Sequence, residues 1–172
     1  MFRKAEISDL DRIEEIYSEI HTEEEAGRAF VNWVREVYPT RTTAEIAIKS
    51  GELFVELDGD IIVASARINQ IQVAEYADAD WRYAAPGDEV MVLHTLAVSP
   101  KFARNGYGRK FVEFYEKYAL ENKCRYLRMD TWEKNSIARA LYKKLGYNEV
   151  GIVVSEFNGI KDFRLVCLEK KL

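Results

Sequence analysis

Two glycines one residue apart precede a helix-like run in the stretch "SPKFARNGYGRKFVEFYEKYA", which begins at Ser99. The first turn of a helix leaves backbone N–H groups without intrahelical acceptors, and the helix dipole adds positive potential there. Gly106 and Gly108 would let an anionic group approach the backbone closely, because neither has a Cβ. Arg104 and Arg109 add full positive charges. The stretch therefore predicts a phosphate-binding site, although a lone pair of glycines is also typical of an ordinary strand–helix turn.

The distribution of charge singles out the same region. The chain of 172 residues has a formal net charge of −4, yet residues 101–144 carry 12 Lys and Arg against 5 Asp and Glu. Residues 1–100 carry 9 against 20. A basic block that coincides with a glycine loop favours an anionic ligand. Because the block is short and the isoelectric point is about 5.4, we expect no nucleic-acid partner.

Two common nucleotide-binding motifs do not fit this loop, and a third pattern does. A dinucleotide fingerprint has a third glycine where "GYGRKF" has Phe111, and a P-loop requires Gly-Lys-Ser/Thr. The segment from His94 to Tyr147 resembles the GCN5-related N-acetyltransferase (GNAT) superfamily, through "LHTLAVSPKFARNGYGRKFVEFYEKYA" and "MDTWEKNSIARALYKKLGY". In that family the loop pattern Gln/Arg-x-x-Gly-x-Gly/Ala holds the pyrophosphate of acetyl-CoA. Gly106 and Gly108 match its glycine positions.

The first position of the family's loop pattern falls on Ala103, which is a departure, and Arg104 could supply the charge one residue later. Asn135, the "ALY" that ends at Tyr142 and the "LGY" after it also match the family. The resemblance therefore implies that acetyl-CoA is the cosubstrate. It implies binding by the following residues: Leu96, Ala97, Val98, Ala103, Arg104, Asn105, Gly106, Tyr107, Gly108, Arg109, Asn135, Ala138 and Tyr142.

The order of the expected elements indicates a mixed sheet flanked by helices, in the α/β or α+β class. Helical periodicity marks 8–20, 26–38, 42–51, the run after the glycine loop, and 135–147. Strand patterns mark 52–69 with a turn at Asp58-Gly59, then 89–100, 124–132, and 148–157 and 161–172 around Asn158-Gly159, whereas 72–88 is expected to be a loop. The resemblance implies a mostly antiparallel central sheet, the GNAT-type acyl-CoA N-acyltransferase fold, in one domain over residues 1–172.

The reaction that the resemblance implies is direct attack of an amine on the thioester. Tyr142 is then the candidate acid that protonates the departing thiolate. Because Ile137, Leu141 and Leu145 form a core-facing stripe, we expect Tyr142 to be offset from the core. On spacing alone, a tyrosine ring packed at the core edge is the simpler interpretation.

Backbone groups complete the cofactor site that the resemblance implies. Free N–H and C=O groups of Leu96 and Val98 would bind the pantetheine arm and the acetyl carbonyl, while the side chains of both residues belong to the core. Asn135 either caps the following helix or bonds the pantetheine arm. The transfer needs no metal.

Glu89 and His94, both on the expected strand 89–100, are the candidates for a general base. His94 lies two residues before Leu96, so the two side chains should share a strand face. Histidine is a natural base near neutral pH, but a structural histidine is an equally ordinary interpretation. Glu89 could act through water, and a deprotonated fraction of the amine could bind without either residue.

The acceptor is expected to be a small basic amine, because "HTEEEAGRAFVNWV" and "YADADWRY" combine acidic and aromatic side chains. A peptide N-terminus is also compatible with this pattern. The rival function is a non-catalytic acyl-CoA-binding sensor or interaction module, and a nucleotide-binding protein without acyl chemistry is a third alternative.

The composition indicates a cytoplasmic protein with no membrane partner, because no apolar run is long enough to span a bilayer and the first residues form no signal region. Cys124 and Cys167 lie far apart without metal-ligand spacing and are expected to be buried free thiols. Exposed strand edges in such a fold allow a homodimer.

Overall fold

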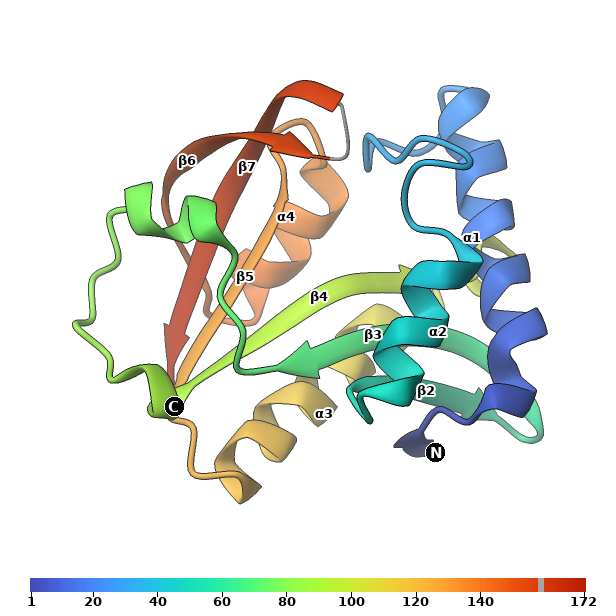
Figure 1. Cartoon of the computed structure of the whole chain (residues 1–172), viewed down its shortest axis with the longest axis horizontal. Coiled ribbons are helices and arrows are strands. Elements are labelled where there is room, and N and C mark those ends of the chain that lie inside the picture. The colour runs from blue at the N-terminus through green and yellow to red at the C-terminus, as the bar shows by residue number, and fades with distance from the viewer. Residues whose placement is uncertain (158–159) are drawn as a thin grey trace. The chain divides into compact units, whose positions relative to one another are not determined.

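The computed structural model describes residues 1–157 and 160–172, and the expected turn at Asn158-Gly159 lies outside them. Its strands are β1 (Phe2–Lys4), β2 (Leu53–Asp58), β3 (Ile61–Asn69), β4 (Val90–Val98), β5 (Tyr126–Trp132), β6 (Asn148–Phe157) and β7 (Ile160–Lys171). The longer helices are α1 (Leu10–Glu25), α2 (Arg41–Lys49), α3 (Tyr107–Glu121) and α4 (Ser136–Lys144) (Figure 1).

The seven strands form one mixed sheet in the order β1-β2-β3-β4-β5-β7-β6. β4 and β5 pair in parallel, whereas β1–β2, β2–β3, β5–β7 and β6–β7 pair antiparallel. The expected fold class, a mixed and mostly antiparallel sheet with helices, is confirmed. By its internal contacts the chain divides into unit 1, residues 1–68 and 94–115, and unit 2, residues 69–93 and 116–172. The prediction of a single domain stays a prediction.

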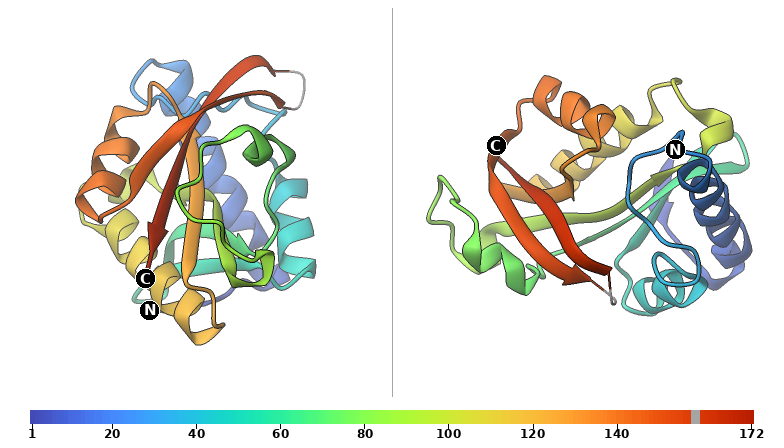
Figure 2. Two further views of the ribbon diagram at one scale, coloured as in Figure 1. Left: turned by 90° about the vertical axis from the view of Figure 1, so that its left-hand side faces the viewer. Right: turned by 90° about the horizontal axis from the view of Figure 1, so that it is seen from above.

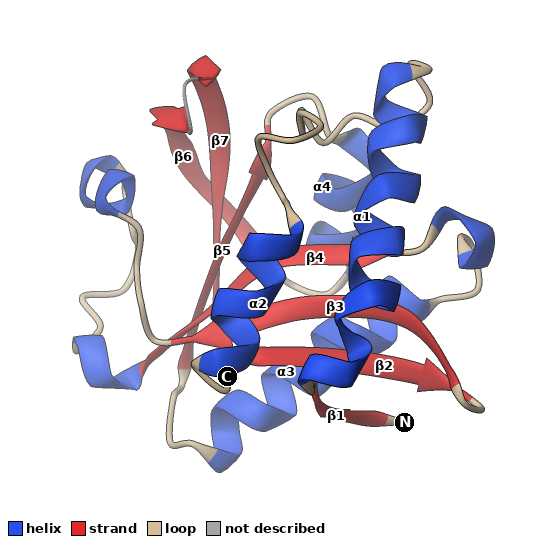
Figure 3. Ribbon diagram, turned by 45° about the vertical axis from the view of Figure 1, so that its right-hand side comes forward, coloured by secondary structure: helices blue, strands red, loops and turns tan. Residues whose placement is uncertain are grey.

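In unit 1, α1 and α2 cover the same face of β2 and β3 (Figures 1 and 3). Alternation along β2 explains this, since Leu53 and Val55 point into a core shared with the two helices. From α1, Ile13 and Ile16 enter the same core with no exposed surface. The helical spacing of the apolar residues in α1 therefore places them on one face of the helix, and this face packs against the sheet.

The opposite face of β2 is covered by the first turns of α3. Phe114 stacks on Phe2 at 4.5 Å between ring centroids and lies 5.5 Å from Phe54. Phe111 meets Phe2 edge to face at 5.4 Å. Phe111, Val112, Tyr115 and Ala119 are fully buried, so the run after the glycine loop is a helix with one apolar face.

In unit 2, β6 and β7 run side by side as a long antiparallel pair (Figure 2). β7 also pairs with β5 over seven residues, from Tyr126↔Lys171 to Trp132↔Leu165. The core on one face joins Val90 and Val92 of β4 with Cys167 of β7 and Tyr76 of the short 3-10 helix η2 (Ala74–Asp78). Cys124 and Cys167 are both buried free thiols, as expected.

Two local predictions are wrong. Residues 26–38 do not form a helix, since α1 ends at Glu25 and Gly27 and Asn32 have positive φ angles of 70° and 57°. The Glu24 carboxylate accepts hydrogen bonds from the backbone N–H groups of Val31 and Asn32, at 2.8 and 3.0 Å, which fixes a turn instead. Glu89 is also not on a strand, because it lies in the 3-10 helix η3 (Gly87–Glu89) and β4 begins at Val90.

Other local signals are confirmed. Asp58-Gly59 joins β2 to β3, with Gly59 at φ 57°, and Gly51, at φ 66°, follows α2. The expected loop 72–88 contains η2 and η3. β1 has no counterpart in the sequence prediction, because three residues are too short for a pattern. Among the described residues, no helix is long and apolar enough to cross a membrane.

One buried carboxyl in unit 1 makes stability depend on pH. Glu56 shares a face of β2 with Phe54, is 2% exposed, and its Oε2 has no hydrogen-bond partner among the described residues. The pKa of Glu56 is raised from 4.5 to about 7, mainly by burial and to a smaller extent by Asp58, while Lys110 and the terminal amino group of Met1 act in the opposite direction.

We therefore expect Glu56 to cost stability as the pH rises from 4.5 to 7, since the folded state keeps a proton there that the unfolded state releases. Below pH 4.5 the carboxyl is protonated in both states and carries no such cost. Urea unfolding of wild type and Glu56→Gln over this range measures the difference. The wild type should lose stability relative to Glu56→Gln with rising pH, and parallel curves would contradict the assignment.

Candidate active site

The loop between β4 and α3 has a backbone that needs glycine at one position. After β4 the chain passes through the 3-10 helix η4 (Pro100–Phe102), and Arg104 and Gly106 take positive φ angles of 64° and 80°. The carbonyl of Gly106 accepts the first helical hydrogen bond, from the N–H of Lys110 at 3.0 Å. A Cβ on Gly106 would meet no protein atom within 4 Å, so the glycine is required by its left-handed backbone.

The side chains around this helix start lie in unit 1 and are mostly exposed. Ala103, Arg104 and Asn105 are exposed, and the amide of Asn105 donates to the carbonyl of Phe102 at 3.3 Å. Arg109 pairs with Glu113 at 2.8 Å, one turn along α3. Arg104 and Arg109 are therefore both exposed near the start of α3, and the charge of Arg109 is partly balanced by that of Glu113.

Tyr107 is tied to the hairpin between β2 and β3. Its hydroxyl donates to Asp58 at 2.7 Å, and Lys110 lies over its ring at 4.7 Å. The hydrogen bond to Asp58 is the main cause that raises the pKa of Tyr107. These contacts fix the first turn of α3 against β2.

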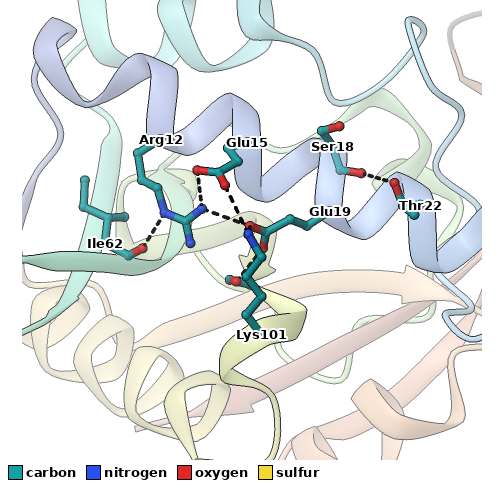
Figure 4. A network of polar contacts seen from close by, with 8 residues as sticks. Arg12, Glu15, Ser18, Glu19, Thr22, Ile62 and Lys101 are labelled. Carbon is teal, nitrogen blue, oxygen red and sulfur yellow. Dashed lines mark hydrogen bonds and ion pairs between the residues drawn. The ribbon is translucent and has the colours of Figure 1, made fainter.

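A network of charges ties α1 to the segment before the loop (Figure 4). Glu19 of α1 accepts hydrogen bonds from the hydroxyl of buried Ser99 and from Lys101, the latter at 2.8 Å. Arg12 contacts Glu19 at 3.0 Å and donates to the carbonyl of Ile62 at 3.1 Å. Burial would raise the pKa of Glu19, but the bonds from Lys101, Ser99 and Arg12 outweigh it and lower the pKa. The segment before the glycine loop is therefore held by the ionised carboxylate of Glu19, which accepts hydrogen bonds from Ser99, Lys101 and Arg12.

The end of β4 is irregular where the cofactor residues are expected. Thr95 has φ 54°, and its hydroxyl is hydrogen-bonded to that of Tyr38. This left-handed residue interrupts the alternation of a regular strand, so the argument that His94 and Leu96 share a face loses its basis. Ala97 is fully buried, whereas Leu96 and Val98 are half-buried. The β4–β5 ladder ends at Leu93↔Met129, although β4 continues to Val98.

α4 in unit 2 carries the remaining predicted residues. The side chain of Asn135 accepts the N–H of Ala138 at 3.1 Å, so Asn135 caps this helix. The expected face of the helix is wrong: Ile137 is 74% exposed, whereas Tyr142 is buried at 6%. Tyr142 packs edge to face on Tyr147 at 6.1 Å, and burial followed by the charge of Asp130 raises its pKa. The phenol therefore stays protonated at neutral pH.

The sequence model of the acetyltransferase (GNAT) family matches residues 10–147, well over half of the chain. The chain belongs to this family. It is an N-acetyltransferase of the GNAT type, and members of this family use acetyl-CoA.

Solved structures agree on the GNAT fold over the full chain. A GNAT-family acetyltransferase from Streptococcus agalactiae has a TM-score of 0.85 at 20% identity, covering 100% of this chain and 95% of that one. One from Listeria monocytogenes has a TM-score of 0.74 at 19% identity, with coverage of 100% and 94%. A protein of Salmonella typhimurium solved with its cofactor acetyl-CoA has a TM-score of 0.69 at 15% identity, with coverage of 100% and 93%. A search of curated proteins gives no match.

The GNAT chain holds a titratable group that the sequence interpretation missed. Asp130 of β5 is half-buried and accepts a hydrogen bond from the hydroxyl of Tyr76 at 2.8 Å. Burial raises the pKa of Asp130 to about 6, and Glu75 adds to this effect, while the bond from Tyr76 opposes it. The only sequence signal was the acidic and aromatic character of "YADADWRY", which does not identify its partner strand.

In this GNAT chain, a buried ion pair holds the segment that brings Tyr76 to Asp130. Arg128 and Glu169 are a directly opposed pair on β5 and β7, 3.3 Å apart, with side chains 8% and 0% exposed. Arg128 donates to the side chain of Gln72 at 2.6 Å and to the carbonyl of Tyr83 at 3.1 Å. Its guanidinium lies 4.0 Å from the ring centroid of Trp81. Residues 72–85, the clamped loop, are thereby fixed at both ends.

Glu169 completes the clamp, since its Oε2 accepts the backbone N–H of Arg82 at 2.9 Å. No group of three or more His, Cys, Asp or Glu within residues 1–157 and 160–172 is placed to hold a metal ion.

We expect Arg128→Met to cost about 3–5 kcal/mol of unfolding free energy, because it leaves the Glu169 charge buried and unpaired. Replacing both partners, Arg128→Met with Glu169→Leu, should recover most of that loss. Urea unfolding of the three proteins measures both effects. A double variant no more stable than Arg128→Met would show that the pair is not the source of the cost.

Proposed function

We propose that this GNAT enzyme transfers acetyl from acetyl-CoA to an amine by direct attack of the amine on the thioester. The phosphates of the cosubstrate bind at the start of α3, on the backbone of Arg104 to Arg109. The observation that carries this is the left-handed Gly106 at the beginning of α3, where no protein atom lies near the position of a Cβ. Helix N–H groups and glycine together suit a pyrophosphate.

The departure at Ala103 is compatible with this proposal. Ala103 has φ −59° and ψ 154°, an extended backbone that needs no particular side chain. Arg104, next to it, is exposed and carries the positive charge that an Arg at the first position of the family pattern would supply. Leu96 and Val98 contribute backbone groups to the pantetheine arm, and Asn135 adds its side chain when it is not capping α4.

Tyr142 is the proposed acid for the CoA thiolate. Its burial keeps the phenol protonated, and among the residues that the structure describes none forms a hydrogen bond with its hydroxyl. A free, protonated hydroxyl is what a departing thiolate requires. Its burial at 6% corrects the expected offset from the core, but it does not remove the hydroxyl from chemistry.

The acceptor is a small basic amine. In unit 1 the acidic run is already used, because Glu23 pairs with Arg28 at 2.6 Å, Glu25 pairs with Arg35 at 2.7 Å, and Glu24 binds backbone. The acidic and aromatic clamped loop of unit 2 is therefore the better source of acceptor contacts. Of the two predicted bases, Glu89 sits in η3 and His94 is half-buried on β4.

Calorimetry tests the phosphate site. Wild type should bind acetyl-CoA with micromolar affinity, and Gly108→Leu should weaken binding at least tenfold, or about 1.4 kcal/mol, because a side chain would stand at the helix start. Gly87→Leu is the matched control, since a Cβ there meets no protein atom within 4 Å. Absence of binding by the wild type, or equal binding by Gly108→Leu, would contradict this placement.

A second test addresses Tyr142. Tyr142→Phe should lower kcat by about 10²-fold or more and leave the Kd of acetyl-CoA unchanged, because it removes only the proton donor. Thiol release in steady state and calorimetry measure the two quantities. Tyr147→Phe, whose ring packs on Tyr142, serves as the control. An unchanged kcat in Tyr142→Phe would remove the acid role, and a binding-only module would show no thiol release in any variant.

A further inference from the structure

Asp130 is placed where its carboxyl can meet a ligand. It is the first residue of β5 beyond the β4–β5 ladder, which ends at Met129. The Tyr76 hydroxyl bonds Oδ2 at 2.8 Å, and no other hydrogen bond from the described residues reaches this carboxyl. Oδ1 therefore keeps its acceptor capacity. A half-buried carboxylate held in this way on a strand is a rigid group.

The clamped loop adds a second carboxylate and aromatic rings beside Asp130. Glu75 is half-buried and accepts a hydrogen bond from Ser155 at 2.6 Å. Its charge is felt at Asp130, so the two carboxylates are close enough to repel. The ring of Tyr76 meets that of Trp81 at 5.0 Å. Two carboxylates with aromatic walls suit a cationic ammonium group.

A second observation concerns the hydroxyl of Tyr142. Tyr142 is only 6% exposed, and its hydroxyl makes no hydrogen bond to the described residues. The charge of Asp130 acts on this phenol. This hydroxyl is not one of the fully buried atoms that lack a partner, so it keeps contact with solvent while having no partner among the described residues. A ligand that reaches Asp130 and the Tyr142 hydroxyl would supply it.

We propose that Asp130 binds the ammonium form of a primary-amine acceptor, together with Glu75, and then takes a proton from its nitrogen. This inference rests on the proposed function and names its general base and its substrate class. Asp130 replaces Glu89 and His94 in that role. Tyr76 is a positioning residue, because it acts on the substrate only through Asp130.

The transfer balances as follows. An N–H bond of the ammonium breaks and its proton goes to the Asp130 carboxylate, which frees the nitrogen lone pair. The lone pair forms the C–N bond with the acetyl carbon, the C–S bond breaks, and the sulfur takes the proton of the Tyr142 hydroxyl. A second nitrogen proton leaves to water as the amide forms. Asp130 returns its proton to water and Tyr142 regains one, so both residues are restored.

The pH dependence follows from the groups that face Asp130. These are Glu75 and Tyr76 of η2, Tyr142 of α4 and Cys167 of β7. Burial raises the pKa values of Tyr142 and Cys167, so both stay protonated near neutral pH, whereas the pKa of Asp130 is about 6. The base must be ionised, so kcat/KM should rise with pH through about 6. The bond from Tyr76 lowers the pKa of Asp130, so removing it should move this rise to higher pH.

The test measures thiol release from acetyl-CoA with a panel of alkylamines, arylalkylamines and a short peptide with a free N-terminus. Asp130→Asn keeps the shape and the bond to Tyr76, and should lower kcat/KM for the best amine by about 10²-fold or more and abolish the rise near pH 6. Its Kd for acetyl-CoA should not change, and its unfolding midpoint should not fall, because Asn removes a carboxyl whose ionisation burial disfavours. Asp162→Asn, at an exposed carboxylate of β7 outside the clamped loop, is the control and should behave as wild type.

Tyr76→Phe separates positioning from structure. It should keep the rise in kcat/KM but shift it to higher pH, which a merely structural loss would not do. The inference is overturned if Asp130→Asn stays within about threefold of wild type, or keeps the rise near pH 6.

Failure of the proposed function gives a different pattern, in which the wild type binds acetyl-CoA but acetylates none of the amines. Asp130 is then tested alone by carboxyl-carbon NMR, with n-butylammonium as the probe and n-butanol as its neutral control. A fall in the pKa of Asp130 with n-butylammonium alone supports the ammonium site. No change overturns it.

Discussion

The buried pair of Arg128 and Glu169 is the constraint on which the arrangement of unit 2 depends. Both residues lie opposite each other on paired strands, so the strand pairing alone sets the distance between them. Burying two charges is costly unless every remaining donor and acceptor finds a partner. The clamped loop meets part of that demand with the side chain of Gln72, the backbone of Arg82 and Tyr83, and the ring of Trp81. The position of Tyr76, and through it the setting of Asp130, follows from that demand.

Unit 1 solves a different problem, that of presenting a helix start to solvent without losing its shape. The left-handed turn at Gly106 cannot be held by its own side chain, so neighbouring elements hold it. Glu19 fixes Ser99 and Lys101 before the loop, and Asp58 fixes Tyr107 after it. Of the exposed residues between these anchors, Gly106 sets the turn and Asn105 donates to the carbonyl of Phe102, and no other element depends on them. That division leaves their backbone available for an anionic ligand.

Local chemistry was predictable from the sequence and long-range placement was not. The glycine turn before α3 and the cap at Asn135 are set by residues within a few positions of one another, and the sequence predicts the turn and gives the cap as one of two roles for Asn135. The helix expected over 26–38 failed because its apolar pattern competes with Gly27 and with the Glu24 carboxylate, which binds the backbone of Val31. The face of α4 was assigned wrongly because Ile137 and Tyr142 lie on different sides of the helix, and only tertiary packing decides which side is buried. Asp130 was missed because its partner Tyr76 is 54 residues away.

The clamp on residues 72–85 has a consequence for how acceptor preference can change in this protein. Two of its contacts, from Glu169 to Arg82 and from Arg128 to Tyr83, are made with main-chain atoms and do not depend on the side chains at those positions. The sheet therefore fixes the backbone path of the loop and depends little on the side chains at these two positions. Substitution of Glu75 or Tyr76 would leave these two main-chain contacts, and the loop before α3, unchanged. In the proposed function, substitutions in this loop would therefore change which amine is accepted and leave the binding of acetyl-CoA as it is.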